Sequence, residues 1–448
     1  MWITMPESSV PVVREADVVV AGGGPAGFGA ALASARSGAS TLLIERYGSL
    51  GGVGTNSMVA GFASGFHDGK RQIIGGAFGE MRERLYEQGA LLKTDSFEPF
   101  DPDRLSFYYM KTLLDAGVSL QLHTFVTDVA MNGDRIEAVI IESKAGRQAI
   151  KAHTFIDATG DADVASRAGV EFEIGRPSDG RMQPVSFMYA LGGVDIGKVI
   201  REEIAKPFNG HISGMDHIIF EGHPDRVALA KERGFLINLP RNEIALAWSL
   251  PGRPDVVYVN FSRIQDVNGT KTEDLIRAEI EGRSQVDEGL AFFRHFMPGF
   301  ENCFLLRTAA QAGVRESRRI VGRYTLTEDD VLRTKQFDDV VAQAHYMIDI
   351  HDPVGQGTRS VKLSQGSSYD IPYRSLLQDK VGNLLVAGRC ISATHEAFSS
   401  LRVMSISMAT GEAAGTAASL CVRNNVSPGE LDPGLLQRKL LSNGAILE

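Results

Sequence analysis

Three glycines near the start of the chain, Gly22, Gly24 and Gly27, have the G-x-G-x-x-G spacing that cradles the pyrophosphate of a dinucleotide. The first permits a tight turn out of a strand, the second lets the backbone approach the phosphates, and the third lets a helix pack closely on the sheet. Glu45 follows 18 residues after Gly27, where its carboxylate can bind ribose hydroxyls and disfavours a 2′-phosphate. The motif predicts a site for FAD or NAD.

The elements that must position this motif can be predicted from the residues around it. Residues 17–21 are a β-branched run typical of a buried strand, and residues 40–44 indicate a second strand. The alanine-rich stretch between them predicts a helix over 25–37, with Pro25 in its first turn and Gly38 just after its end. Strand, glycine turn, helix and strand together form one βαβ unit, which disfavours a mere glycine-rich turn.

Three further features favour FAD over NAD. A second glycine cluster, 50–55, follows Glu45 almost at once, and a predicted strand over 154–158 ends in the Thr-Gly-Asp turn 159–161. Near the C-terminus the run 383–389 is another strand that ends in a glycine turn. The chain has neither a second G-x-G-x-x-G after a central strand nor a C-x-x-C pair, so we predict no second nicotinamide site and no dithiol centre.

These segments resemble the glutathione-reductase-type FAD fold and, more closely, the bacterial family described as FAD-dependent oxidoreductase. The resemblance extends to residues 314–319, 348–353 and 388–397 and so covers nearly the whole chain. Arg389 departs from the wider fold, where many relatives have Asp. The resemblance implies that Gly22, Gly24, Pro25, Ala26 and Gly27 hold the pyrophosphate, Glu45 the ribose, Arg46, Gly51, Gly52 and Thr55 the ribityl and flavin side, the Val126 backbone the adenine, Thr159, Gly160 and Asp161 the middle of the cofactor, and Gly388, Arg389, Met408 and Gly411 the flavin ring.

Two histidines and two arginines are the main candidates for catalysis beside a flavin. A neutral base assists hydride removal from an alcohol or amine, and histidine suits this task. We predict this role for His351 and His395, with a satisfied structural side chain as the alternative. We predict that Arg315 and Arg402 clamp an anionic substrate or balance charge on the reduced flavin, with a salt-bridged interdomain face as the alternative. Secondary candidates are His67, Arg318, Arg319, Tyr346, Tyr369 and Tyr373.

The chain length of 448 residues suggests two interlocked domains. We predict an α/β fold: a Rossmann-like FAD-binding domain, with a parallel sheet, helices and a small antiparallel layer, formed by residues 1–169 and 376–448. Residues 170–375 are predicted to form an inserted α+β substrate domain. Further predictions are a helix over 102–116 capped by Asp101, an antiparallel layer within 118–160, no regular structure over 47–80, and helices over 272–281 and 404–422.

Composition limits the partners and the compartment. The formal net charge of −9 disfavours nucleic acid as a partner. The three cysteines, Cys303, Cys390 and Cys421, are odd in number and far apart, which argues against a disulfide framework or a metal cluster and favours the cytoplasm. Residues 1–7 lack the pattern of a secretory signal, and no apolar run approaches the roughly 18 residues that span a bilayer.

The leading hypothesis is an FAD-dependent oxidoreductase that transfers a hydride between the flavin and a small polar metabolite. The alternatives are a flavin monooxygenase or a carrier-fed reductase, and a non-catalytic FAD- or nucleotide-binding protein. The expected partners are a small-molecule substrate and an electron acceptor. The substrate, the acceptor, the oligomeric state and the nature of the flavin linkage stay open; Cys390 is a candidate for a covalent link, with a buried free thiol as the favoured alternative.

Overall fold

A parallel sheet surrounds the glycine motif in the computed structural model, which describes residue 3 and residues 9–94, 97–208 and 215–448. Most of residues 1–7, where the sequence predicts no secretory signal, lie outside this description. The strand order is β5-β2-β1-β8-β7-β6, and β21 pairs in parallel with the end of β8. The strands are β1 (Val12–Ala21), β2 (Thr41–Ile44), β5 (Ser119–Gln121), β6 (Phe125–Asn132), β7 (Arg135–Ser143), β8 (Gly146–Asp157) and β21 (Leu384–Val386).

The register of this sheet brings four strand ends to one edge. Ala21 of β1 is level with Ile44 of β2 and with Asp157 of β8, and Asp157 is level with Val386 of β21. Every predicted cofactor turn begins at this carboxyl edge, where ligands of parallel sheets bind. The strands β6 and β7 form the predicted antiparallel layer beside β8. The predicted α/β class of the fold is confirmed.

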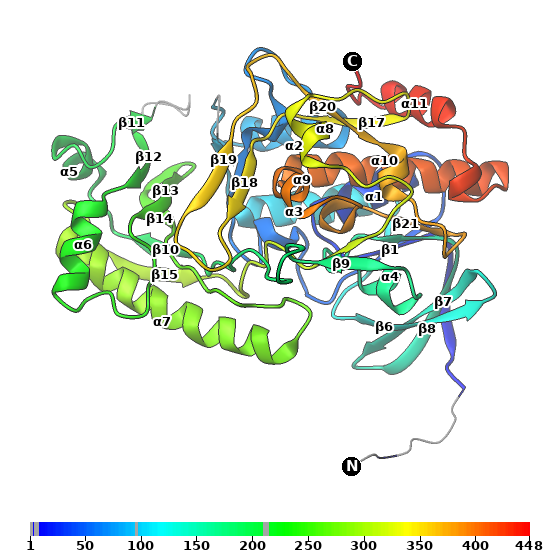
Figure 1. Cartoon of the computed structure of the whole chain (residues 1–448), viewed down its shortest axis with the longest axis horizontal. Helices are drawn as coiled ribbons and strands as arrows, with labels where there is room; N and C mark the ends of the chain where they lie inside the picture. The colour runs from blue at the N-terminus through cyan, green and yellow to red at the C-terminus, as the bar shows by residue number, and fades with distance from the viewer. Residues whose placement is uncertain (1–2, 4–8, 95–96, 209–214) are drawn as a thin grey trace.

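Two helices cross tightly above the sheet: α1 (Pro25–Arg36) and α10 (Met404–Asn424), drawn in blue and orange in Figure 1. A Cβ atom on Gly411 would lie 2.0 Å from the Ala26 carbonyl oxygen, and one on Gly415 would lie 2.0 Å from that of Ala30. Any side chain at either glycine would therefore push the helices apart. These contacts fix α10, which begins near the flavin-side glycine loop, against the helix that starts at Pro25.

A second, antiparallel sheet lies within residues 189–308, with strand order β11-β12-β13-β14-β10-β15 (Figure 1). Its strands are β10 (Tyr189–Gly192), β11 (Pro207–Phe208), β12 (His217–Gly222), β13 (Ile244–Leu250), β14 (Arg253–Asn260) and β15 (Phe304–Thr308). It belongs to the predicted substrate domain, whose boundaries at residues 170 and 375 stay a prediction.

The helix predicted over 272–281 is longer than expected: α7 runs over Thr272–Phe296. Its two internal glycines are not stop signals, because they face the second sheet. A Cβ on Gly282 would lie 2.7 Å from the Phe187 side chain, and one on Gly289 would lie 2.3 Å from the Tyr189 hydroxyl. Close packing on the sheet thus outweighs the low helix propensity of glycine.

The prediction of irregular structure over 47–80 is wrong in its second half. Strand β3 (Gly61–Ala63) is followed by helix α2 (Gly76–Glu87). Helix α2 was missed because the glycine-rich sequence around Gly75 and Gly76 does not indicate a helix, although α2 has a buried apolar face that includes Phe78, Met81 and Leu85.

The remaining elements are α3 (Pro102–Asp115), α4 (Asp163–Arg167), α5 (Ile196–Arg201), α6 (Pro224–Glu232), α8 (Glu328–Leu332), α9 (His395–Leu401) and α11 (Pro433–Ser442), with β4 (Phe97–Pro99), β9 (Phe172–Ile174), β16 (Arg318–Ile320), β17 (Val340–Ala344), β18 (Ile348–His351), β19 (Thr358–Val361) and β20 (Tyr369–Pro372). Among the described residues, no helix has the length and apolar character required to cross a membrane.

A buried carboxyl group on α10 joins that helix to α2. The Ala77 N–H donates to Glu412 Oε2 at 3.0 Å, and burial raises the pKa of Glu412 to about 7. The unfolded chain ionises near the ordinary value of 4.5, so the unfolded state binds fewer protons than the folded state between these values. The stabilising contribution of the neutral group is therefore lost as the pH rises through 7.

We expect the substitution Glu412→Gln to remove this loss, because glutamine stays neutral and keeps an acceptor for Ala77. The free energy of unfolding of the variant minus that of wild type should therefore increase by on the order of 2 kcal/mol from pH 5 to pH 8. Urea unfolding of both proteins at the two pH values measures the difference. Parallel pH dependence in wild type and variant would contradict the assignment.

Candidate functional site

The three motif glycines differ in what surrounds them. Gly22 leaves β1 with φ +101°, and a Cβ there would lie 2.4 Å from the Ala158 carbonyl oxygen. A Cβ on Gly27 would lie 1.7 Å from the Gly22 carbonyl oxygen. A Cβ on Gly24 would meet nothing closer than 3.9 Å, at Gly52. Of the three, Gly24 alone borders open space, in front of the free N–H groups at the start of α1.

The second glycine cluster lies directly against the first. The Gly51 N–H donates to the Gly23 carbonyl oxygen at 2.8 Å, and a Cβ on Gly52 would lie 2.9 Å from the Gly24 Cα atom. Gly51 and Gly52 have φ values of +111° and +54°, which suit glycine. Thr55 holds the loop through its hydroxyl, which donates to the Leu50 carbonyl at 2.9 Å. The two loops form one cradle.

Glu45 follows β2 and shapes the cradle itself. Its carboxylate accepts the Gly23 N–H at 2.7 Å and the Tyr47 N–H at 2.9 Å, and burial raises its pKa. The backbone that leads to Val126 passes beside it, because the Thr124 N–H donates to the Glu45 carbonyl at 3.0 Å. Arg46 is exposed and lies over the Tyr47 ring. The predicted ribose and adenine contacts thus lie at the same end of the cradle.

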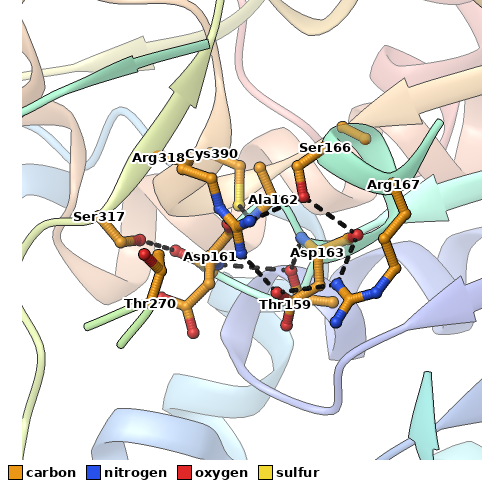
Figure 2. A network of polar contacts seen from close by, with 12 residues as sticks. Thr159, Asp161, Ala162, Asp163, Ser166, Arg167, Thr270, Ser317, Arg318 and Cys390 are labelled. Carbon is orange, nitrogen blue, oxygen red and sulfur yellow. Dashed lines mark hydrogen bonds and ion pairs between the residues drawn. The ribbon is translucent and has the colours of Figure 1, made fainter. Parts of the chain in front are cut away.

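The Thr-Gly-Asp turn is tied into a polar network, which Figure 2 shows. The Thr159 hydroxyl donates to the buried Asp157 carboxylate at 2.7 Å and accepts the Asp163 N–H at 3.0 Å. Arg318 donates to the Asp161 carbonyl at 2.6 Å and to the Asp163 carboxylate at 2.6 Å. Arg318, a secondary candidate for an anion clamp, therefore braces this turn.

Arg389 reaches the same turn from the end of β21. Its Nε donates to the Gly160 carbonyl at 2.7 Å, its Nη2 to Asp161 Oδ1 at 2.6 Å, and its Nη1 to the Val314 carbonyl. An arginine at this position thus joins the turn to the segment that carries Arg315. The predicted contact of Arg389 with the cofactor stays a prediction.

The three other residues predicted at the flavin ring contact neighbouring parts of the protein. Gly388 has φ +73°, and its N–H donates to the Thr410 hydroxyl at 3.1 Å. Met408 is fully buried beside Gly29, and Gly411 faces Ala26, so both lie where α1 crosses α10. Their packing positions the start of α10.

His395, in the first turn of α9, is buried with only 3% of its surface exposed. Its Nδ1 lies 2.8 Å from Oε1 of Glu316, whereas its Nε2 has no hydrogen-bond partner among the described residues. Glu316 is also buried and accepts hydrogen bonds from Arg319 and from the Gln183 N–H, the latter at 3.0 Å. Arg319, another secondary clamp candidate, is thus committed to Glu316.

Glu316 is a site residue that sequence reasoning missed. The available signal was its place within the family-like segment 314–319, where it follows Arg315 directly. The charge run in that segment suggested a salt-bridged interdomain face as the alternative. In the structure the run instead divides, with Glu316 turned to His395 and Arg318 to the cofactor turn.

The structure gathers His351, Arg315 and Arg402 around Asp349 of β18. His351 Nε2 lies 3.5 Å and Arg402 Nη2 lies 3.0 Å from Asp349 Oδ2. Burial, followed by the charge of Arg315, lowers the pKa of His351 to about 3, so this imidazole is neutral near pH 7. The Gln183 side-chain oxygen accepts the backbone N–H of His351 at 3.2 Å, and the backbone N–H of Gln183 donates to Glu316. Gln183 therefore links this group to Glu316 and His395.

The other secondary candidates separate into two kinds. The Tyr369 hydroxyl is bonded to Ser400 Oγ at 2.6 Å, and the Tyr373 hydroxyl donates to the Pro428 carbonyl at 3.0 Å, so both rings belong to the core. The His67 side chain accepts the Gly69 N–H at 3.0 Å and so stabilises the turn in which it lies. Tyr346 alone faces the Asp349 group; burial, followed by the Asp349 charge, raises its pKa.

Buried polar atoms that have no hydrogen-bond partner in the described part of the chain lie at the flavin side of the cradle. They include Asn56 Nδ2, which follows the second glycine cluster, and Ser405 Oγ in the first turn of α10. A Cβ on Gly54 would lie 3.0 Å from Met404 Sδ, so the cluster and the start of α10 adjoin. Open space at Gly24 at one end and unpaired polar atoms at the other fit a long dinucleotide such as FAD.

Cys390 packs against Ala162, the residue that follows the Thr-Gly-Asp turn. Its side chain is fully buried, its Sγ accepts the Ala162 N–H at 3.1 Å (Figure 2), and burial raises the pKa of the thiol well above the ordinary value. A thiol that stays protonated is a poor nucleophile. We therefore expect non-covalent FAD. Acid precipitation of the purified protein should release the flavin absorbance into the supernatant, and retention in the pellet would contradict this expectation.

Comparisons with known proteins identify the family of this chain. A sequence profile of the family described as FAD dependent oxidoreductase matches residues 17–440. A thiamine thiazole synthase from Methanococcus vannielii is 34% identical over 161 residues, which are 34% of this chain and 59% of the relative. The corresponding enzyme from Methanococcus maripaludis is 31% identical over 156 residues, 33% of this chain and 57% of the relative. The alignments thus span less than two thirds of these relatives.

Among solved structures, the flavin-dependent brominase Bmp2 has a similar fold. It superimposes with a TM-score of 0.51 and 13% identity, over 96% of this chain and 84% of the brominase. At this identity the likeness concerns the fold alone. The family match covers nearly the whole chain, including every predicted cofactor segment. The chain therefore belongs to the FAD dependent oxidoreductase family, whose cofactor is FAD.

Proposed function

We propose that this protein transfers a hydride between FAD and a small polar metabolite, with His395 as the base. The observation that carries the proposal is the buried His395–Glu316 pair, which leaves His395 Nε2 without a hydrogen-bond partner among the described residues. Ser317, the residue after Glu316, donates to the Gly160 carbonyl of the cofactor turn at 3.0 Å. FAD, when bound, supplies a two-electron acceptor for the hydride.

Glu316 determines which nitrogen of His395 is available. Its carboxylate accepts the Nδ1–H of His395 at 2.8 Å, which leaves the lone pair on Nε2. A carboxylate in this position also stabilises the imidazolium that forms on proton uptake, as in other base–carboxylate pairs. The hydrogen bonds from Arg319 and Gln183 hold Glu316 in place. Glu316 is thus a positioning residue.

The proposed step balances for an alcohol or an amine. The substrate C–H bond breaks with its electron pair, the hydride leaves carbon, and the O–H or N–H proton moves to His395 Nε2. A C=O or C=N bond forms in the product. His351 can assist by accepting a hydrogen bond, because its lowered pKa keeps it neutral.

The proposed cofactor arrangement is that of the glutathione-reductase-type fold. The Gly22–Gly27 loop and the start of α1 would hold the pyrophosphate, with Glu45 at the ribose. Residues 51–55 and the start of α10 would hold the flavin. The supporting observation is that these segments leave the aligned strand ends Ala21, Ile44 and Val386.

The partners and the compartment are also proposals. We propose a small-molecule substrate, an electron acceptor that docks directly at the flavin, and a location in the cytoplasm. The three cysteines are free and buried, which suits a reducing compartment. The net charge of −9 gives no support for nucleic acid as a partner. The division into residues 1–169 with 376–448 and 170–375 remains our proposal for the domains.

Anaerobic titration of the FAD-loaded protein tests the function. We expect a hydroxy or amino metabolite to bleach the oxidised flavin absorbance without any added reductant. Reduction only by NAD(P)H or by a reduced carrier protein would instead support the monooxygenase or carrier-fed alternative. A flavin that none of these agents reduces would support a non-catalytic binding protein.

A further inference from the structure

Four arginines meet beside the proposed flavin site although they come from separate elements. Arg241 precedes β13, Arg263 follows β14, Arg315 precedes β16 and Arg402 ends α9. Arg241 and Arg263 are 7% and 1% exposed. Such burial is costly for a charge that has no counterion.

Hydrogen bonds join Arg241 and Arg315 through Ser262, whereas Arg263 is its chain neighbour and donates through Nη2 to the Asp352 carbonyl at 2.7 Å. Arg241 Nε donates to the Ser262 carbonyl at 3.1 Å, and Arg263 is the next residue along the chain. Arg315 Nη2 donates to Ser186 Oγ at 2.8 Å, and Ser186 Oγ lies 3.5 Å from the same Ser262 carbonyl. Arg402 completes the group through Asp349, at 3.0 Å.

Positive charge in this group exceeds negative charge. Within the described residues Asp349 is the buried carboxylate that acts on Arg241, Arg315 and Arg402. The carboxylate nearest in effect to Arg263 is Asp352, which is 47% exposed, and Glu243 is also exposed. Burial, followed by the charges of Arg402 and Arg241, lowers the pKa of Arg315. Because arginine stays protonated in proteins, this excess of buried positive charge suits the binding of an anion.

Several donors of the group are free for a ligand. Arg263 Nε and Nη1 and Arg402 Nε are buried and have no hydrogen-bond partner among the described residues. Solvent nevertheless reaches the group, because the side chains of Arg402 and His351 are 14% and 15% exposed. Guanidinium groups bind carboxylates through paired N–H donors.

We infer that Arg241, Arg263, Arg315 and Arg402 bind a small dicarboxylate, which is the metabolite of the proposed reaction. That the dicarboxylate is the substrate rests on the proposed function, whereas the anion-binding site itself rests only on the arrangement of the arginines. Four guanidinium groups on different elements suit two separated anionic groups better than one. The site lies beside the flavin-side loop, because the Gly313 N–H donates to the Ser186 carbonyl at 2.7 Å and a Cβ on Gly313 would lie 3.4 Å from Ser57.

Calorimetric titration of the FAD-loaded protein tests the site without any turnover. The probes are malonate, succinate and glutarate, each compared with its neutral diamide. We expect at least one dicarboxylate to bind and its diamide to bind about tenfold to hundredfold more weakly, since hydrogen bonds to charged groups are lost. This comparison needs only the wild-type protein, so it stands even where a variant fails to fold.

Variants then locate the site. Arg315→Gln and Arg402→Gln should each weaken dicarboxylate binding about tenfold to hundredfold. The control is Arg374→Gln, since Arg374 pairs with Asp339 at 2.9 Å and is 47% exposed, outside the group. Equal binding by the variants and the control, or binding of inorganic phosphate but of no dicarboxylate, would overturn the inference.

The two proposals fail in different ways. Dicarboxylate binding that depends on Arg315 and Arg402, with no flavin reduction by any metabolite, would retain the anion site and refute hydride transfer. Flavin reduction by a neutral alcohol or amine, with no dicarboxylate binding, would retain hydride transfer and refute the anion site.

Discussion

The substitution His395→Ala should lower the rate of anaerobic flavin reduction by about a hundredfold to ten-thousandfold, the usual contribution of a general base. The reason is geometric: Nε2 has no hydrogen-bond partner among the residues that the structure describes, and the other nitrogen of this buried imidazole is held by Glu316. Stopped-flow measurement with the metabolite that reduces the wild type fastest gives the rate. Bound FAD, read from the absorbance spectrum, should stay at the wild-type amount.

Two controls separate catalysis from folding. His295→Ala is the matched variant, since His295 is exposed on α7, where it bonds to the Ala291 carbonyl of its own helix at 2.8 Å and its ring lies beside Phe235. It should reduce flavin at the wild-type rate. Added imidazole should partly restore the rate of His395→Ala, which a merely structural histidine would not allow. A His395→Ala rate within threefold of wild type, with FAD bound, would refute the role of His395 as base.

The elements on the cofactor side of this protein could be predicted from local sequence patterns. Asp101 accepts the Asp103 and Arg104 N–H groups, at 2.9 and 3.1 Å, and starts the helix that its sequence predicts. Such caps, glycine turns and β-branched runs act over a few residues, so one sequence is enough to reveal them. The βαβ unit and the long α10 were predictable for the same reason.

The pairing of residues on the substrate side was not predictable, because its contacts join distant segments. His395 and Glu316 are 79 residues apart in the chain, and Arg241 meets Arg315 only through the fold. The direction of a side chain in an irregular segment has no periodicity to reveal it. Arg315, Arg318 and Arg319 are close in sequence yet serve three different partners. The candidates Arg315 and Arg402 were named from the sequence, whereas Arg241, Arg263 and Glu316 required the structure.

The cofactor site can be tested by replacing each of two nearby glycines, Gly24 and Gly27, with alanine, because the two variants should differ in FAD affinity and in stability. Gly24→Ala should weaken FAD binding about tenfold to hundredfold, because its methyl group enters the space in front of α1. The protein itself accommodates that methyl group: φ is −74° and the nearest atom is 3.9 Å away. Apoprotein stability should therefore fall by less than about 1 kcal/mol, the usual effect of alanine at a helix N-cap.

Gly27→Ala should instead destabilise the apoprotein, because its Cβ would lie 1.7 Å from the Gly22 carbonyl oxygen and the backbone must move. Gly357→Ala is the control, since nothing lies within 4 Å of its Cβ position, and it should change neither property. Fluorescence titration with FAD and urea unfolding of the apoproteins measure both quantities. Wild-type affinity in Gly24→Ala would place the pyrophosphate elsewhere, whereas lost affinity with retained stability ties the open space at Gly24 directly to the cofactor.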